Sequence, residues 1–77
     1  MNHPLYQLLA DLEEASIYFV LNRTRSDSVL VSLTLAGERV EVDVFEDGHM
    51  EVARFRGDES IEGDQALVQR LIEENRD

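Results

Sequence analysis

The side chains in this chain that could bind a metal or act as an acid or base are chiefly two histidines and 17 carboxylates, and cysteine and lysine are both absent. Their absence excludes thiolate chemistry, cysteine metal ligands, Schiff-base formation and the phosphate-binding lysine of a P-loop. His3 and His49 lie far apart in the sequence, and neither has a partner at a ligand spacing such as His-x3-His. We therefore expect no metal site and no bound cofactor.

The carboxylates include four adjacent pairs, at Glu13-Glu14, Glu46-Asp47, Asp58-Glu59 and Glu73-Glu74. General acid–base catalysis needs two carboxylates that face each other across a cleft with separated pKa values, whereas neighbours on a helix or turn point apart into water. No serine, histidine and acid form a nucleophile arrangement, and the four glycines are scattered turn residues rather than a phosphate-binding loop. The sequence predicts that the protein is not an enzyme.

The net charge is −10, and most of it lies in one part of the chain. Residues 38–64 contain ten acids and three arginines. Residues 1–37 contain four acids and two arginines, and residues 65–77 contain three acids and two arginines. Such a surface repels nucleic-acid phosphates and attracts basic proteins, although acidity also improves solubility. We expect a protein partner, with a basic one as the natural complement, and no binding to nucleic acid.

Length and composition are typical of one soluble globular domain spanning residues 1–77. A domain of this size buries only about 60% of the surface of its unfolded chain, so we expect one thin core and no deep pocket. No segment approaches the roughly 18 continuous apolar residues of a membrane span, and the N-terminus lacks a secretory signal. With the absence of cysteine, these features predict a cytoplasmic protein without membrane contact.

Two segments have the apolar spacing of a helix. Pro4 suits the opening turn of the first, after Asn2 or His3, and a helix is predicted over residues 4–15. Asp64 is a suitable N-cap for the second, predicted over residues 65–75, with Ile61 placed as a hydrophobic staple against Val68. The apolar stripes consist of Leu5, Leu8, Leu9 and Leu12 in the first helix and Leu67, Val68, Leu71 and Ile72 in the second.

Between the helices the apolar period changes to two, which indicates β-strands. The first strand starts at Ile17 and ends at a polar turn over residues 22–27, and the second covers residues 29–35. The third covers residues 39–45 and forms a hairpin with a fourth over residues 49–56; residues 58–63 then make a polar, acidic connection.

The register of this hairpin decides which side chains reach the core. A two-residue Asp47-Gly48 turn pairs Val44 with Glu51 and buries a carboxylate. A three-residue loop over residues 46–48, with Gly48 left-handed in a G1 bulge, instead pairs Val44 with Met50 and Val42 with Val52. We prefer the second register, because a one-residue slip exchanges the two faces of the strand.

The predicted fold class is α+β, with the order α-β-β-β-β-α. Four antiparallel strands form a meander, and both helices pack on one face so that all three apolar stripes are buried together. The opposite face is left open. On it we expect a mixture of aromatic, apolar and acidic side chains that suits a protein partner, formed by Tyr18, Leu30, Glu41, Asp43, Phe45, Glu51 and Phe55. The alternative is that Arg39, Arg54 or the chain ends cover the aromatics and that Glu41 pairs with an arginine.

The stretch from Gly37 to Val52, with its Gly-Glu-Arg and Phe-Glu-Asp-Gly-His segments, resembles a pattern shared by short uncharacterised bacterial proteins. In size and acidity the chain is also similar to immunity proteins of bacterial toxin systems. The meander between two helices and the acids Asp11, Glu13 and Glu14 resemble frataxin-like proteins, which implies metal binding as a less favoured alternative.

The function predicted from the sequence is a non-enzymatic, acidic protein-interaction module, of which a toxin-neutralising immunity protein is the most specific form. The alternative is a homodimeric structural or regulatory domain that uses the same apolar residues.

Overall fold

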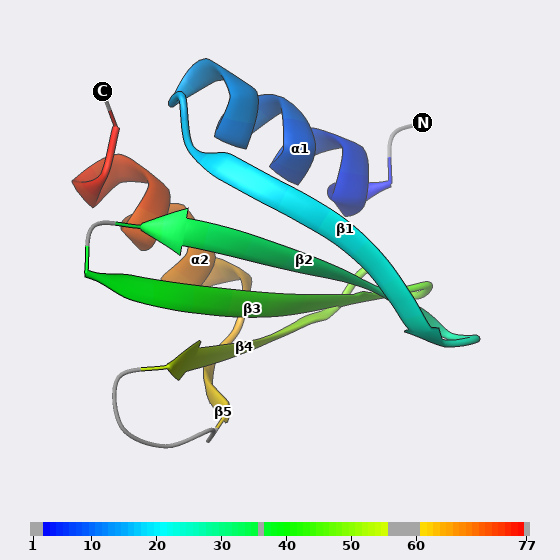
Figure 1. Ribbon diagram of the computed structural model, residues 1–77. Helices are drawn as coiled ribbons and strands as arrows, with labels where there is room; N and C mark the ends of the chain where they lie inside the picture. Colours follow the sequence, from blue (N-terminus) through cyan, green and yellow to red (C-terminus); the bar gives the residue numbers. More distant parts are fainter. Residues whose placement is uncertain (1–2, 36, 56–60, 77) are drawn as a thin grey trace.

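The computed structural model describes residues 3–35, 37–55 and 61–76, with the backbone alone described for Phe55, Ile61 and Glu62. The chain forms a helix, a meander of antiparallel strands and a second helix, so the predicted α+β class and element order are confirmed (Figure 1). The elements are α1 (Pro4–Glu14), β1 (Tyr18–Arg25), β2 (Ser28–Leu35), β3 (Glu38–Phe45), β4 (Met50–Phe55), β5 (Ile61–Gly63) and α2 (Gln65–Glu74).

Both helices begin at side-chain caps. The His3 ring accepts a hydrogen bond from the Leu5 amide at 3.1 Å, and the Asp64 carboxylate accepts one from the Ala66 amide, also at 3.1 Å. Each bond satisfies one of the amides that a helix leaves unpaired in its first turn. Pro4 occupies the first turn of α1, where its missing N–H costs nothing.

The end of α1 is a Schellman motif built around a serine. The Ile17 amide donates to the Leu12 carbonyl at 3.0 Å and the Ser16 amide donates to the Glu13 carbonyl at 3.2 Å. Ser16 has φ 59°, a left-handed conformation that usually requires glycine. This motif reverses the chain so that Ile17 enters the core directly before β1.

The strands follow one another in the sheet in chain order, and the hairpin between β3 and β4 has the register with the three-residue loop. Val44 lies opposite Met50 and Val42 lies opposite Val52, as predicted. Gly48 has φ 97°, its amide donates to the Phe45 carbonyl at 2.8 Å, and the Phe45 amide donates to the His49 carbonyl at 2.9 Å. These features define the G1 bulge, which keeps the valines of β3 in step with the apolar residues of β4.

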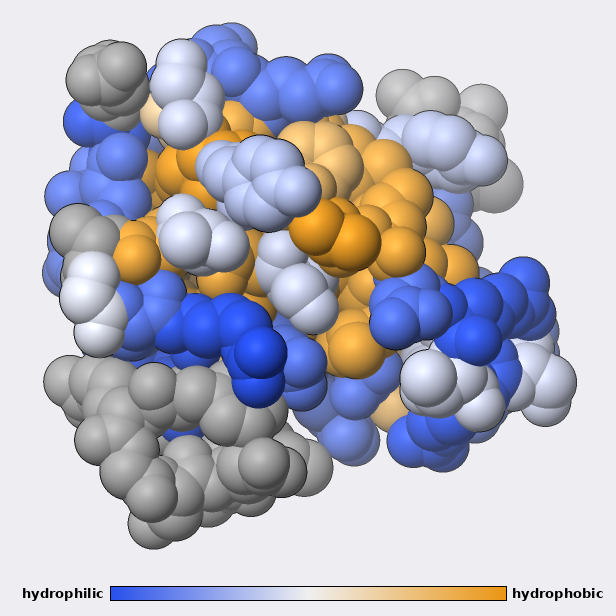
Figure 2. All heavy atoms as spheres, viewed as in Figure 1, coloured by the Kyte–Doolittle hydropathy of each residue, from blue (hydrophilic) through white to orange (hydrophobic). Residues whose placement is uncertain are grey.

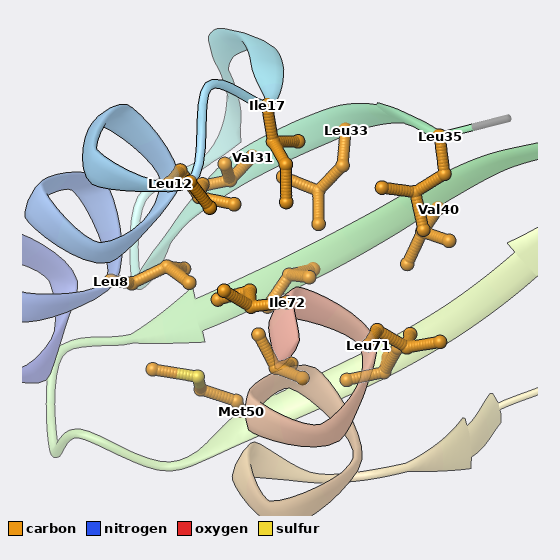
Figure 3. Packing of buried hydrophobic residues seen from close by; sticks show 14 of the residues in the cluster. Leu8, Leu12, Ile17, Val31, Leu33, Leu35, Val40, Met50, Leu71 and Ile72 are labelled. Atoms are coloured by element: carbon orange, nitrogen blue, oxygen red, sulfur yellow. The ribbon is translucent and has the colours of Figure 1, made fainter. Parts of the chain in front are cut away.

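One core lies between the helices and one face of the sheet. Side chains from both helices point toward the same sheet residues, as Figure 3 shows for Leu8 and Leu12 of α1 and for Leu71 and Ile72 of α2. The sheet residues beneath them alternate along each strand, as expected for a sheet buried on one side. They include Val31, Leu33, Val40, Val42, Val44, Met50 and Val52.

The strands differ from the prediction at both edges of the sheet. Residues 22–25, predicted to be a turn, continue β1 as far as Arg25, which pairs with Ser28, and the turn is reduced to Ser26 and Asp27. Residues 61–63, predicted to be a connection, form β5 against β4. Neither segment has the alternating apolar residues that indicate a strand in the sequence. Each becomes a strand because its backbone pairs with a neighbouring strand. The staple predicted for Ile61 rests on a side chain outside the described residues.

A Gly48→Ala variant should be less stable than the wild type by about 2 kcal/mol, because an L-residue is strained at this φ. The added Cβ would also lie 3.3 Å from the Pro4 side chain. Gly37→Ala is the matched control, since Gly37 has φ 80° with no atom within 4 Å of an added Cβ. Urea unfolding of the three proteins measures both effects, and an equal loss in the two variants would contradict a role for the contact with Pro4.

A Ser16→Gly variant should be more stable than the wild type by about 1 kcal/mol, because glycine adopts the left-handed conformation without strain. Thermal unfolding with a Ser26→Gly control, which changes the same residue type in the β1–β2 turn, measures the gain. A loss of stability at position 16 would contradict the motif.

Candidate interaction face

The candidate site is the sheet face that the helices leave uncovered, here called the open face. Pairing between strands places its side chains in rows, because residues opposite each other in antiparallel strands point to the same side. One row is Asn22, Leu30, Asp43 and Glu51, and the next is Val20, Ser32, Glu41 and Ala53. The structure thus brings together on one face five of the seven predicted partner-binding residues, namely Tyr18, Leu30, Glu41, Asp43 and Glu51.

The centre of the open face is acidic. Asp43 on β3 lies directly opposite Glu51 on β4. Glu41, two residues before Asp43, lies on the same side of β3. Arg39 lies in the neighbouring row, and its Nε is 4.0 Å from a Glu41 carboxylate oxygen while its side chain is 59% exposed. Among the described residues no cation lies within ion-pair distance of Asp43, so two like charges face each other across the strands.

The part of the open face over β1 and β2 carries exposed apolar side chains among polar ones. Tyr18 is 68% exposed and Val20 is 47% exposed. Leu30, directly opposite Asp43, is partly buried and joins this apolar area to the acids. Figure 2, viewed from this side, shows hydrophobic residues in the middle of the face, interspersed with residues of intermediate hydropathy and bordered by hydrophilic ones.

Phe45 is not available as an exposed anchor, which corrects the expectation from the sequence. Its side of the strand is the open face, but the residue is only 7% exposed. The His49 ring stacks on it with centroids 4.2 Å apart, and the Arg25 guanidinium lies 5.0 Å from its centroid. The other aromatic predicted there, Phe55, has a side chain outside the described residues.

The arginines considered as covers for the aromatics lie on different sides of the sheet. Arg54 points to the helix side, where it forms a bidentate ion pair with Glu38. Its Nε donates to Glu38 Oε1 at 2.8 Å and its Nη2 donates to Glu38 Oε2 at 2.9 Å. Arg39 pairs with Glu41, as the alternative expected, and lies opposite Phe55, whose side chain is outside the described residues. Arg25, at the end of β1, covers Phe45. Sequence reasoning missed this contact because it assigned Arg25 to a turn rather than to a strand next to β2.

The acidic tip of the β3–β4 hairpin is organised around His49. The Asp47 carboxylate accepts a hydrogen bond from the His49 amide at 3.0 Å and lies 2.5 Å from the ring Nδ1. The backbone bond and then the ring bond hold the pKa of Asp47 below its ordinary value. The ring Nε2 lies 3.9 Å from Glu51, which links the tip to the acidic centre of the open face.

The acids of α1 bridge the two helices. Asp11 accepts hydrogen bonds from Gln7 at 2.9 Å and from Gln69 of α2 at 3.4 Å, and Glu14 pairs with Arg76 at 2.7 Å. Within the described ranges no three histidine, cysteine or acidic side chains are grouped so that they could hold a metal ion. In the same ranges no helix has the length and apolar character needed to cross a membrane.

Comparisons of the chain with protein-family models, with curated proteins and with solved structures found no match.

The lowered pKa of Asp47 predicts an acid-dependent loss of stability in the hairpin tip. A carboxyl whose pKa is lower in the folded than in the unfolded state stabilises the fold above the unfolded value, and this contribution disappears as pH falls through the folded value. We expect the Asp47 carboxyl to titrate below 3.8 in carbon-detected NMR, and its midpoint to move upward in a His49→Ala variant. The alanine keeps the amide bond, so an Asp47 midpoint unaffected by this variant would contradict the contribution of the His49 ring.

Proposed function

We propose that this chain is a non-enzymatic interaction module that binds a cationic protein partner with its open face. The observation that carries the proposal is the pairing of Asp43 with Glu51 across β3 and β4. Like charges directly opposite each other in a sheet destabilise the free protein by about 0.2–1 kcal/mol, so neutral residues would favour folding. An arginine or lysine from a partner would remove this repulsion in the complex.

The surroundings of the acidic pair suit such a partner. Leu30 lies directly opposite Asp43, and the exposed side chains of Val20 and Tyr18 continue the apolar area across β1. A partner surface with arginines beside one or two apolar anchors matches this arrangement, because interfaces combine an apolar centre with charged groups that fix orientation. Phe45 contributes indirectly, since its stack with His49 supports the hairpin next to Glu51.

The charge of the whole chain favours rapid association with a basic protein. The net charge is −10, and ten of the 17 acids lie in residues 38–64, which include β3 and β4. A field of this sign accelerates encounter with cationic partners and disfavours nucleic acids. A cytoplasmic bacterial immunity protein that neutralises a basic toxin is the most specific form of the proposal.

The test is to replace the acidic pair without changing its shape. An Asp43→Asn/Glu51→Gln variant should fold with equal or greater stability, by about 0.2–1 kcal/mol per relieved contact, yet lose the partner. The immobilised variant and the wild type are compared for proteins captured from the source organism, and the association rate of each captured protein is measured at several salt concentrations. We expect the wild type to capture a basic protein whose association rate falls with salt.

The matched control is Glu46→Gln/Glu74→Gln, which removes the same charge from two exposed side chains away from the open face. This control should retain the partner. Capture of identical proteins by all three forms would overturn the role of the open face, and a marked loss of stability in the Asn/Gln variant would show that the pair is structural.

A further inference from the structure

The two edges of the sheet differ in a way that points to a second binding site. The β5 edge is short, with three residues and a register irregularity against β4, which are common features of a protected edge. The β1 edge has eight residues, and its first five, Tyr18–Asn22, pair without interruption with β2. Alternate backbone groups along this regular segment have no other described strand beside them (Figure 1).

The side chains of β1 are those of an interior strand. Ile17-Tyr18-Phe19-Val20-Leu21 is a continuous apolar run, whereas an edge strand with one solvated face usually alternates. Tyr18 and Val20 extend from the open face, and Leu21, on the helix side, is as exposed as Val20 at 47%. The run contains no charge, proline or glycine, the devices that usually prevent edge strands from pairing.

The charge along this edge favours a second copy of the chain as the occupant. Residues 15–26 contain two arginines and no acid, so this is a basic segment in a chain of net charge −10. Acids lie just before it, and Glu13 borders the same shallow surface depression as Ile17 and Phe19. An antiparallel copy would bring the basic end of one β1 to the acidic beginning of the other, twice in each dimer.

We propose that two copies of this chain pair antiparallel along β1, about a two-fold axis at Val20, to form one continuous sheet. This register places Val20 opposite the same residue of the other copy, Phe19 opposite Leu21, and Tyr18 opposite Asn22. Opposed residues then share a face, as antiparallel pairing requires, and the helices of both copies lie on one side. The regular segment Tyr18–Asn22 is paired over its whole length.

The register also brings Arg23 of one copy close to a carboxylate of the other copy. Arg23 would lie opposite Ile17 of the other copy, beside Glu13 of that copy. In the single chain its guanidinium group donates to the backbone carbonyls of Arg25 and Ser26, at 3.2 and 2.6 Å. A carboxylate at this position adds a charge-assisted contact.

Sedimentation equilibrium from micromolar to millimolar concentration tests the proposal, with the wild type expected to form a dimer. Val20→Lys and Leu21→Lys should each raise the dissociation constant about tenfold or more, because lysine on an edge strand opposes pairing and at position 20 the two lysines would face each other. Tyr6→Lys is the control, since Tyr6 is an equally prominent apolar side chain, 68% exposed, on α1. Circular dichroism checks that each variant folds.

A charge exchange tests the register. Arg23→Glu and Glu13→Arg should each weaken the dimer, and the chain carrying both changes should recover most of the affinity. In a mixed sample of labelled and unlabelled protein, isotope-filtered NMR should show contacts between Phe19 of one copy and Leu21 of the other. A wild type that stays monomeric at millimolar concentration would overturn the proposal, as would a dimer insensitive to both lysine variants.

The test separates this inference from the proposed function. Leu21→Lys changes a side chain on the helix side and leaves the open face intact, and the Asn/Gln variant leaves β1 intact, so either site can fail alone.

Discussion

The register of the β3–β4 hairpin is the constraint on which the rest of the structure depends. The left-handed Gly48 adds one residue to the loop, and Val44 therefore meets Met50 rather than Glu51. With the alternative register a carboxylate would face the core and the apolar stripe of β4 would face solvent. The same bulge that assembles the core thus places Asp43 and Glu51 opposite each other on the open face, so the core and the candidate site have one structural cause.

A second constraint is the size of the chain. Two helices of 11 and 10 residues cover one face of the sheet, and no described element covers the other. The apolar residues of β3 and β4 are concentrated on the covered side, which leaves acids on the open side, whereas β1 also places the apolar side chains of Tyr18 and Val20 on the open side. The chain therefore presents an acidic area on β3 and β4 next to exposed apolar side chains on β1.

The sequence predicted those features that depend on local pattern. The helices, the caps, the loop at Gly48 and the assignment of side chains to the two faces all follow from periodicity and from residues with specific backbone preferences. The sequence did not predict β5, the length of β1 or the Schellman turn at Ser16, because each is fixed by backbone pairing or by a conformation that serine rarely adopts. Phe45 shows the same limit in the site, since the side chains over its ring include Arg25, twenty residues earlier in the chain, together with His49.

The two proposed surfaces support each other geometrically. A two-fold axis perpendicular to the sheet keeps the open faces of both copies on the same side, and β2 separates β1 from the acidic residues of β3. The acidic centres of the two copies would then lie on one broad surface, on either side of an apolar seam formed by Val20 and Tyr18. A basic partner with two arginine clusters, or a basic partner that is itself two-fold symmetric, would bind such a surface through both centres at once. The second contact is then intramolecular, so its contribution to affinity is set by effective concentration rather than by the strength of either contact alone. Pairing along β1 would in this way convert a modest acidic pair into a bivalent site, which links the edge of the sheet to the charge on its face.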